Sequence, residues 1–303
     1  MWHDDPMSLL SARAIGVVQI LLSGICFGFI GIFAKGAYER GLEAGEVLSL
    51  RFLVASSLLI GFLSLTSFRR LFLPKAHFLW SIFLGMIGYA VFSYCFFKAL
   101  TGLSASLTVL LLYMYPVMVP IGGLLFLGER IPKNRLIALP VALTGLVILV
   151  WGDFQIREPL YLIFGIASAV FYSIYILCSR RFLAEADTLS SIAYIQLSGG
   201  IALGLVHWSG FDRFTFAITE AWPWILGLAV ICSIAAMSLF LAGLKRLQSW
   251  ETSILSISEP VTTLLLASIL LGERMTQLQV IGATLVLAAL ILVSLPSRIR
   301  YDS

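Results

Sequence analysis

The chain has 303 residues, of which 60% are hydrophobic and only 12% are charged, and its mean hydropathy is +1.00. A soluble domain is about 45–50% apolar and about 25% charged, so this chain lacks the polar groups that would cover a water-facing surface. The composition excludes a soluble enzyme, a nucleic-acid-binding protein and a disordered chain. The formal net charge of +4 therefore needs another explanation.

Long apolar stretches follow one another along the whole chain. A membrane-spanning helix takes about 20 apolar residues, and ten stretches come near this length. They cover residues 14–34, 46–65, 76–97, 104–127, 134–151, 159–178, 189–208, 221–242, 250–271 and 276–295. The sequence predicts an all-α polytopic membrane protein with ten transmembrane helices, the first of them retained rather than cleaved as a signal peptide.

Basic residues gather on one side of these ten helices. The loops and tails of that side hold thirteen of them: Arg13, Arg69, Arg70, Lys75, Arg130, Lys133, Arg135, Arg180, Arg181, Lys245, Arg246, Arg298 and Arg300. The other side holds six: Lys35, Arg40, Lys98, Arg157, Arg213 and Arg274. Short cytoplasmic loops carry the excess of Lys and Arg. We therefore expect both termini in the cytoplasm and a multi-pass protein in the inner or plasma membrane, with the lipid bilayer, not nucleic acid, as its partner.

The second half of the chain repeats the first at an offset of 144 residues. Matching pairs are Trp80 and Trp224, Pro116 and Pro260, and Gly128-Glu129-Arg130 and Gly272-Glu273-Arg274. Apolar matches are common between membrane segments, but a Trp, a Pro and a Gly-Glu-Arg at one offset indicate a duplication. Each half contains five spans, an odd number, so the second half must enter the membrane from the opposite side. We expect two inverted five-helix repeats, residues 12–151 and 156–296, an arrangement that supports alternating access to a central site.

The same motifs resemble a known family. Ser258-Glu-Pro-Val-Thr-Thr263, the following Leu-Leu-Gly-Glu-Arg274 and Gln279-Val-Ile-Gly-Ala283 are similar to the second half of an EamA-type transporter of the drug/metabolite transporter superfamily. Tyr115-Pro-Val117 and Leu127-Gly-Glu-Arg130 resemble the first half. The resemblance covers about residues 12–296. It implies ten helices, cytoplasmic termini and a central cavity that carries amino acids, nucleotides, vitamins or drug-like amphiphiles, but it names no substrate.

Glu259 is the leading candidate for a functional residue, because a carboxylate deep inside a membrane span is costly and usually functional. It could take up a proton for coupling or face a substrate ammonium group. The alternative is a structural carboxyl group, hydrogen-bonded to Ser256, Ser258 or another helix, that fixes helix packing. Pro260 removes a helical N–H, so we expect a kink there that leaves backbone polar groups available.

The position equivalent to Glu259 in the first half is Tyr115, beside a second expected kink at Pro116. Tyr113 and Tyr115 are candidates for the cavity wall, with aromatic packing as the alternative. Arg51 lies about five residues into the second span. Its first interpretation is a side chain that snorkels to the membrane interface, and its second is an anchor for a substrate carboxylate or an ion-pair partner of Glu259.

Aromatic residues also recur at helical spacing in the first and sixth spans, where Phe29 and Tyr175 are further cavity candidates. The two Gly-Glu-Arg motifs stand between consecutive helices. Glycine suits a helix C-cap and glutamate suits the N-terminus of the helix that follows. We interpret Gly128, Glu129, Gly272 and Glu273 as structural turns.

Several function classes can be compared on motifs alone. No phosphate-binding GxxxxGK[ST] motif occurs, which excludes ATP-driven transport by this chain. The aspartates lie in expected loops or tails and no GxSxG or HExxH motif appears, so an enzyme, a metal site and a cofactor are not expected. A channel would show polar or charged rings repeated by symmetry, whereas the polar residues expected at the middle of these spans are few and differ between the halves. The sequence favours a secondary transporter of small organic metabolites such as amino acids or amphipathic drug-like compounds, acting as an exporter. The alternative is an uptake carrier or passive facilitator for a vitamin or nucleoside, and monomer and homodimer both remain open.

Overall fold

The computed structural model describes residues 6–152, 156, 158–207, 211–272 and 274–295. Within these ranges every regular element is a helix, apart from an isolated bridge between Leu103 and Ile156. Nine helical segments of the described chain are long and apolar enough to cross a membrane, and the tenth expected span contains the shorter apolar helix Ala138–Leu149. The prediction of an all-α polytopic fold with ten spans is confirmed.

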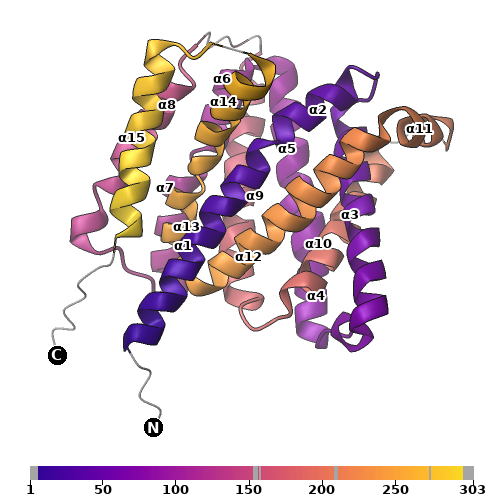
Figure 1. Cartoon of the computed structure of the whole chain (residues 1–303), viewed down its shortest axis with the longest axis horizontal. Helices are drawn as coiled ribbons and strands as arrows, with labels where there is room; N and C mark the ends of the chain where they lie inside the picture. The colour runs from indigo at the N-terminus through magenta and orange to yellow at the C-terminus, as the bar shows by residue number, and fades with distance from the viewer. Residues whose placement is uncertain (1–5, 153–155, 157, 208–210, 273, 296–303) are drawn as a thin grey trace.

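The helices of the two halves can be followed in Figure 1. The first half holds α1 (Pro6–Gly28), α2 (Ile30–Tyr38), α3 (Ala44–Thr66), η1 (Phe68–Leu71), α4 (Lys75–Phe83), η2 (Leu84–Ala90), α5 (Val91–Gly102), α6 (Ala105–Leu112), α7 (Tyr115–Gly122), η3 (Gly123–Leu127), η4 (Lys133–Arg135) and α8 (Ala138–Leu149). The second half holds α9 (Tyr161–Phe182), α10 (Thr188–His207), α11 (Phe211–Gly227), η5 (Leu228–Ala235), α12 (Ala236–Arg246), α13 (Ser249–Leu255), α14 (Ser258–Leu271) and α15 (Gln277–Ser294).

The packing of these helices follows the duplication. At the offset of 144 residues α3 corresponds to α10 and α8 to α15, and in both cases the two related helices pack against each other. The contact between α1 and α12 has its counterpart in the contact between α9 and α5. Irregularities repeat as well, since the π-helical turns η2 and η5 begin at Leu84 and Leu228. The two halves are therefore related by a pseudo-two-fold axis.

The repeats run in opposite directions through the molecule. In Figure 1, α6 and α7 descend toward the end of the molecule where the described chain begins and finishes, whereas α13 and α14 rise away from it. We call this end the terminal face and define it by Arg13, Glu129, Arg135, Glu251 and Ser294. The opposite end, the distal face, carries Gly102, Trp151 and Gln279.

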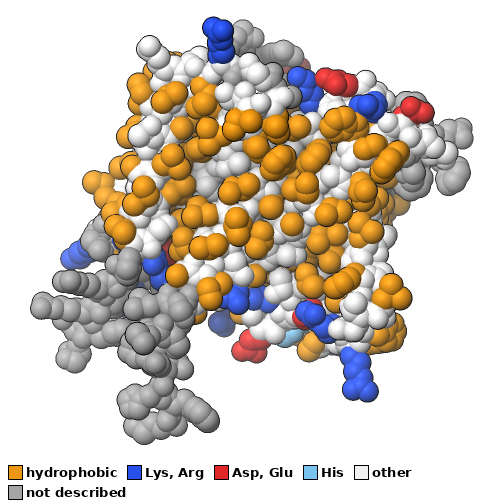
Figure 2. Space-filling view, viewed as in Figure 1, with side chains coloured by type: hydrophobic (Ala, Val, Ile, Leu, Met, Phe, Trp, Pro, Cys, Tyr) orange, Lys and Arg blue, Asp and Glu red, His pale blue; other side chains and the backbone are white. Residues whose placement is uncertain are grey.

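Apolar side chains cover the lateral surface between these two faces. Figure 2 shows them as a broad band, with charged side chains gathered above and below it. Leu65 is 90% exposed and Leu205 is 83% exposed. Side chains this apolar are stable at such exposure in contact with lipid tails rather than with water. Every backbone polar group within the band must be satisfied internally, which is why the elements there are helical.

Polar groups at helix ends fix where several of the spans begin. Glu43 and Glu46 form a capping box at the start of α3, and Thr276 and Gln279 form one at the start of α15. Asp187, which corresponds to Glu43 in the other repeat, accepts the N–H of Ser190 at 3.0 Å at the start of α10. These caps satisfy N–H groups that have no partner within the helix.

Candidate functional site

Two interrupted helices build the centre of the molecule. The chain turns at Tyr113 and Met114 between α6 and α7, and at Ser256 and Ile257 between α13 and α14. Each interruption stands just before a proline, Pro116 or Pro260. A proline cannot donate the helical hydrogen bond and crowds the preceding turn. The sequence thus places broken backbone at equivalent depths in both halves.

A cavity of about 560 Å³ lies above these two interruptions and extends toward the distal face. Its inner end is formed by Tyr113, Tyr115, Glu259 and Pro260, and its outer part by Ser106, Trp151 and Gln279. Trp151 is 60% exposed, which marks the mouth. Aromatic side chains from both halves make up much of the wall: Phe27, Tyr89, Phe92, Phe96, Phe97, Tyr113, Tyr115, Trp151 and Tyr172.

Glu259 is the acidic side chain of this cavity among the residues that the structure describes. It sits in the first turn of α14, where the positive end of the helix dipole favours a carboxylate. The Tyr113 side chain lies beside it at the floor of the cavity. Tyr115, its equivalent in the first repeat, is 2% exposed and also lines the cavity. The two halves therefore present different chemistry at the same depth.

Arg51 is the basic side chain that lines the cavity among the described residues. It is only 4% exposed, so the snorkelling interpretation was wrong: the side chain turns inward from α3 instead of reaching the interface. Its guanidinium carbon lies 4.7 Å from the centre of the Phe52 ring, and Nη2 donates a long hydrogen bond of 3.4 Å to the Tyr89 hydroxyl. Nε is buried without a hydrogen-bond partner in the described part of the chain.

The other two aromatic candidates, Tyr175 and Phe29, do not line the cavity. Tyr175 is 2% exposed and packs against the wall residues Tyr89 and Tyr172, with ring centroids 5.4 and 6.0 Å away. Phe29 stacks on Phe33 at 5.9 Å, in a separate apolar cluster between α2, α3 and η5. Tyr89 and Tyr172 take part directly instead. Tyr172 stood out in the sequence only as one member of an aromatic run, and nothing in the sequence distinguished Tyr89.

The glycines of the two Gly-Glu-Arg motifs have matching backbone geometry. Gly128 and Gly272 both adopt the left-handed conformation, with φ of +68° and +70°, which a residue with a side chain rarely adopts. Glu129 does not cap the following helix as expected. Its carboxylate accepts the Ser249 N–H at 2.9 Å and so caps α13 of the other repeat, and Arg180 lies 3.8 Å away. Glu273 lies outside the described residues.

Metal ligands do not cluster in the described part of the chain, where no group of three or more His, Cys, Asp or Glu side chains is placed to hold an ion. The cavity instead offers one guanidinium, one carboxylate and several phenol hydroxyl groups within an apolar wall. Such a chamber can bind a small organic molecule that carries both charges or a polar head.

Comparison with known proteins places this cavity in a family context. The model of the EamA-like transporter family matches residues 14–151 and again residues 159–295. The chain belongs to the EamA-like transporter family. It is therefore a membrane transporter of the drug/metabolite transporter superfamily built from two EamA repeats, and not an enzyme.

Relatives of this EamA protein match two thirds or more of its length at low identity. An "Uncharacterized transporter" of Archaeoglobus fulgidus is 28% identical, with 91% of this chain and 95% of the relative covered. The "Uncharacterized inner membrane transporter YicL" of Salmonella typhimurium is 25% identical over 94% and 97% of the two chains. A "Probable amino-acid metabolite efflux pump" of Escherichia coli is 23% identical over 67% and 72%. A solved structure titled "Crystal structure of protein" shares the fold, with a TM-score of 0.77, 20% identity and 93% and 96% coverage.

Proposed function

We propose that this EamA protein is a secondary transporter that exports a small amphipathic metabolite of the amino-acid type by alternating access around the central cavity. The observation that carries the proposal is that Arg51 and Glu259 both line the same aromatic cavity. A zwitterion could place its carboxylate against the guanidinium and its ammonium group against the carboxylate. Each such charge-assisted hydrogen bond contributes about 1.5–3 kcal/mol.

Size and charge favour this class over others. A cavity of about 560 Å³ falls in the range of about 300–1,000 Å³ typical of small-molecule sites. A nucleotide or phosphate would call for several cationic side chains, whereas Arg51 is the basic one among the described lining residues. The rings of Tyr113, Tyr115 and Tyr172 suit an apolar substituent and the face-on approach of an ammonium group.

Direction and orientation are parts of the same proposal. Two relatives, from Salmonella typhimurium and Escherichia coli, bear the name "Probable amino-acid metabolite efflux pump", which supports export of such compounds. A third bears the name of an inner membrane transporter. With the excess of basic residues on the terminal face, we place both termini in the cytoplasm of a cell whose inner or plasma membrane holds the protein.

Counterflow in proteoliposomes containing the purified protein tests the proposal. The vesicles are loaded with an unlabelled compound, and uptake of its radiolabelled form is followed for amino acids, nucleosides and a lipophilic cation. Saturable counterflow of amino acids, competed by related amino acids, is the expected result. Saturable flux of nucleosides alone would contradict the substrate class, and flux that never saturates would indicate a passive facilitator.

The Arg51→Gln variant tests how the substrate is held. We expect the half-saturation concentration for an amino acid to rise by about 10- to 100-fold, the loss of one charge-assisted bond of about 1.5–3 kcal/mol. The corresponding amino-acid amide, which has no carboxylate, should be affected far less. Lys75→Gln, which removes an exposed charge from the terminal face, serves as the matched control. An equal loss for acid and amide would show that Arg51 supports packing only.

A further inference from the structure

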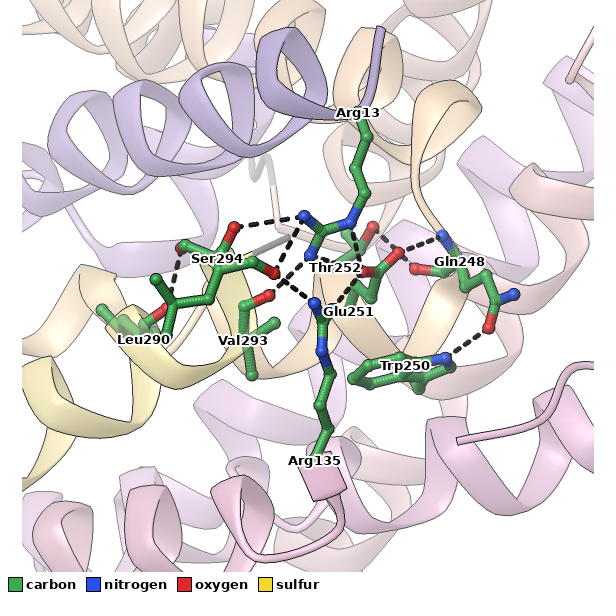
Figure 3. Close-up of polar contacts among 10 residues, drawn as sticks. Arg13, Arg135, Gln248, Trp250, Glu251, Thr252, Leu290, Val293 and Ser294 are labelled. Carbon is green, nitrogen blue, oxygen red and sulfur yellow. Dashed lines mark hydrogen bonds and ion pairs between the residues drawn. The ribbon is translucent and has the colours of Figure 1, made fainter. Parts of the chain in front are cut away.

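The terminal face is closed by a buried cluster of three charged side chains. Glu251, in the first turn of α13, accepts hydrogen bonds at its Oε1 from Nε of Arg13 at 3.0 Å and from Nη1 of Arg135 at 3.2 Å (Figure 3). The Glu251 and Arg135 side chains are only 8% and 3% exposed. Arg13 belongs to α1 and Arg135 to η4, so a single carboxylate joins elements of both repeats. We call these three residues the terminal triad.

The two arginines of the terminal triad also hold the end of α15. Arg13 donates from Nη2 to the Val293 carbonyl at 2.6 Å and from Nη1 to the Ser294 carbonyl at 3.1 Å. Arg135 donates to the carbonyl of Leu295. Figure 3 shows the two guanidinium groups converging from opposite sides on Glu251 and on this helix end. Carbonyl groups at a helix C-terminus lack partners within the helix and attract cations, so these contacts fasten α15 over the terminal end of the pathway.

The equivalent positions of the other repeat line the open mouth of the cavity. Val293, Ser294 and Leu295 correspond to Leu149, Val150 and Trp151, and all three of these line the cavity. Trp250, buried beside Glu251 at 2% exposure, corresponds to the lining residue Ser106. One set of related segments is thus drawn together at the terminal face while the other stands apart at the distal face, as alternating access between inverted repeats requires.

The sequence does not repeat the terminal triad at the equivalent positions of the other half. At the offset of 144 residues Glu251 corresponds to Leu107, and Arg135 corresponds to Gln279. Only the position of Arg13 keeps its charge, as Arg157, which lies outside the described residues. Because Leu107 supplies no carboxylate, a conformation closed at the distal face cannot assemble an equivalent triad.

We propose that Glu251 is a positioning residue that makes the conformation closed at the terminal face and open at the distal face the resting state of the empty transporter. This inference rests on the proposed alternating-access function. A ligand shifts a conformational equilibrium by its difference in affinity for the two states. A solute in the cavity, held more tightly when the distal face closes, therefore offsets the loss of the terminal triad. Without a solute, the carrier changes slowly from this resting state to the conformation open at the terminal face. Transport therefore becomes an exchange of one solute for another.

Two introduced cysteines at equivalent positions report which end is open. Ser253 is fully buried beside the terminal triad, and its equivalent in the first repeat, Val109, lines the cavity. Maleimide labelling of Ser253→Cys and Val109→Cys is measured in the purified full-length protein without substrate. Each rate is taken above the background of the four native cysteines. In the resting state Val109→Cys should react and Ser253→Cys should not; equal reactivity would contradict the assigned resting state.

Glu251→Gln should raise the labelling rate of Ser253→Cys by about tenfold or more and lower that of Val109→Cys, since a minor state is commonly populated at about 0.1–10%. Glu185→Gln removes an exposed carboxylate near the same face and should change neither rate. Leu107→Glu combined with Gln279→Arg rebuilds the triad chemistry at the distal face. This double variant should likewise raise the labelling rate of Ser253→Cys and lower that of Val109→Cys, with the native triad intact. It tests the role of the triad if Glu251→Gln does not fold.

Wild-type labelling rates at both reporters in folded Glu251→Gln and in the double variant would overturn the proposal. Labelling requires no substrate and no flux. A failure of this test therefore bears on the role of Glu251 alone, whereas a failure of counterflow in protein that switches normally bears on the proposed substrate class.

Discussion

At the scale of single residues, Glu259 is a position at which the two halves of the pathway differ in charge. The duplication supplies a tyrosine, Tyr115, at the equivalent position, so among the described residues Glu259 is the one acid at the floor of the cavity. Its neighbour Tyr113 can donate to the carboxylate but cannot neutralise it. A carboxyl group that faces a chamber open to one side at a time is suited to exchange protons with that side.

Replacement of this acid tests the coupling directly. Glu259→Gln keeps the shape of the side chain beside Tyr113 but cannot change its charge. We expect it to abolish the response of counterflow to an imposed pH gradient while saturable exchange persists at a reduced rate. Glu158→Gln, an exposed acid on the distal side, should retain the response. Gradient-dependent flux of normal size in Glu259→Gln would remove this residue from any coupling mechanism.

At the scale of elements, the pair α8 and α15 depends on close backbone contact. A Cβ atom added to Gly282 would lie 2.5 Å from the Leu149 amide nitrogen and 2.7 Å from the Gly145 carbonyl oxygen. Both contacts are with backbone, so neither neighbour can move aside. Small residues at helix contacts in membranes permit such approach, and packing rather than the hydrophobic effect drives association there.

Gly282→Ala should therefore lower the free energy of unfolding by about 1–3 kcal/mol, the usual cost of overpacking. Gly61 lies on the exposed side of α3, with nothing within 4 Å of an added Cβ, and is the matched control. Gly61→Ala should leave stability unchanged or raise it slightly, because alanine favours a helix by about 1 kcal/mol. The comparison is made by thermal unfolding in detergent. Equal behaviour of the two variants would mean that the helix pair can separate without cost.

The start of α10 depends on Asp187, which lies outside the spans between α9 and α10. Hydrogen bonds from Ser190 and from Arg70, whose Nε lies 3.0 Å from Oδ2, outweigh partial burial and lower the pKa of Asp187. A depressed pKa in the folded state means that the ionised carboxylate adds stability above its unfolded pKa of about 3.9. That contribution is lost as the pH falls through the lower folded value.

Asp187→Asn keeps an acceptor for the Ser190 N–H but loses the charge that pairs with Arg70, so it should lower the melting temperature at pH 7 by an amount corresponding to about 0.2–1 kcal/mol. The gap between variant and wild type should narrow as the pH falls below about 4, where the wild-type carboxylate becomes protonated. Melting curves of both proteins across this pH range provide the measurement. A gap that stays constant down to pH 2.5 would show that charge plays no part in the cap.

At the scale of the whole molecule, the bilayer made the architecture predictable from sequence. Span length, the shared offset and the odd number of spans per half fix an inverted repeat without knowledge of any contact. These features do not determine whether a side chain points toward the cavity, a packed cluster or the lipid. Arg51 and Phe29 lie on spans that are apolar all round, so helical periodicity could not tell a cavity wall from a packed cluster. The terminal triad joins Arg13 to Glu251 across 238 residues, and no local sequence pattern predicts this contact.

Orientation in the membrane is the remaining property of the whole molecule, and it decides what the cavity faces. The excess of Lys and Arg on the terminal face predicts that this face lies in the cytoplasm. The distal mouth then opens outside the cell. Glu158 and Glu185 are exposed near the distal and terminal faces respectively. In intact cells a membrane-impermeant maleimide should therefore label Glu158→Cys and reach Glu185→Cys only after permeabilisation.

The reverse labelling pattern would reverse the inferred direction of the transport cycle. The resting cavity would then face the cytoplasm and would take up its cargo there. With the expected pattern, an exporter that rests open to the outside must refill or protonate its cavity before it can turn inward again. Export would then be coupled to the entry of a counter-solute or a proton. The need for a counter-solute or a proton follows from the difference between the two faces. Glu251 holds the terminal face closed, whereas Leu107, at the equivalent position of the distal face, supplies no carboxylate.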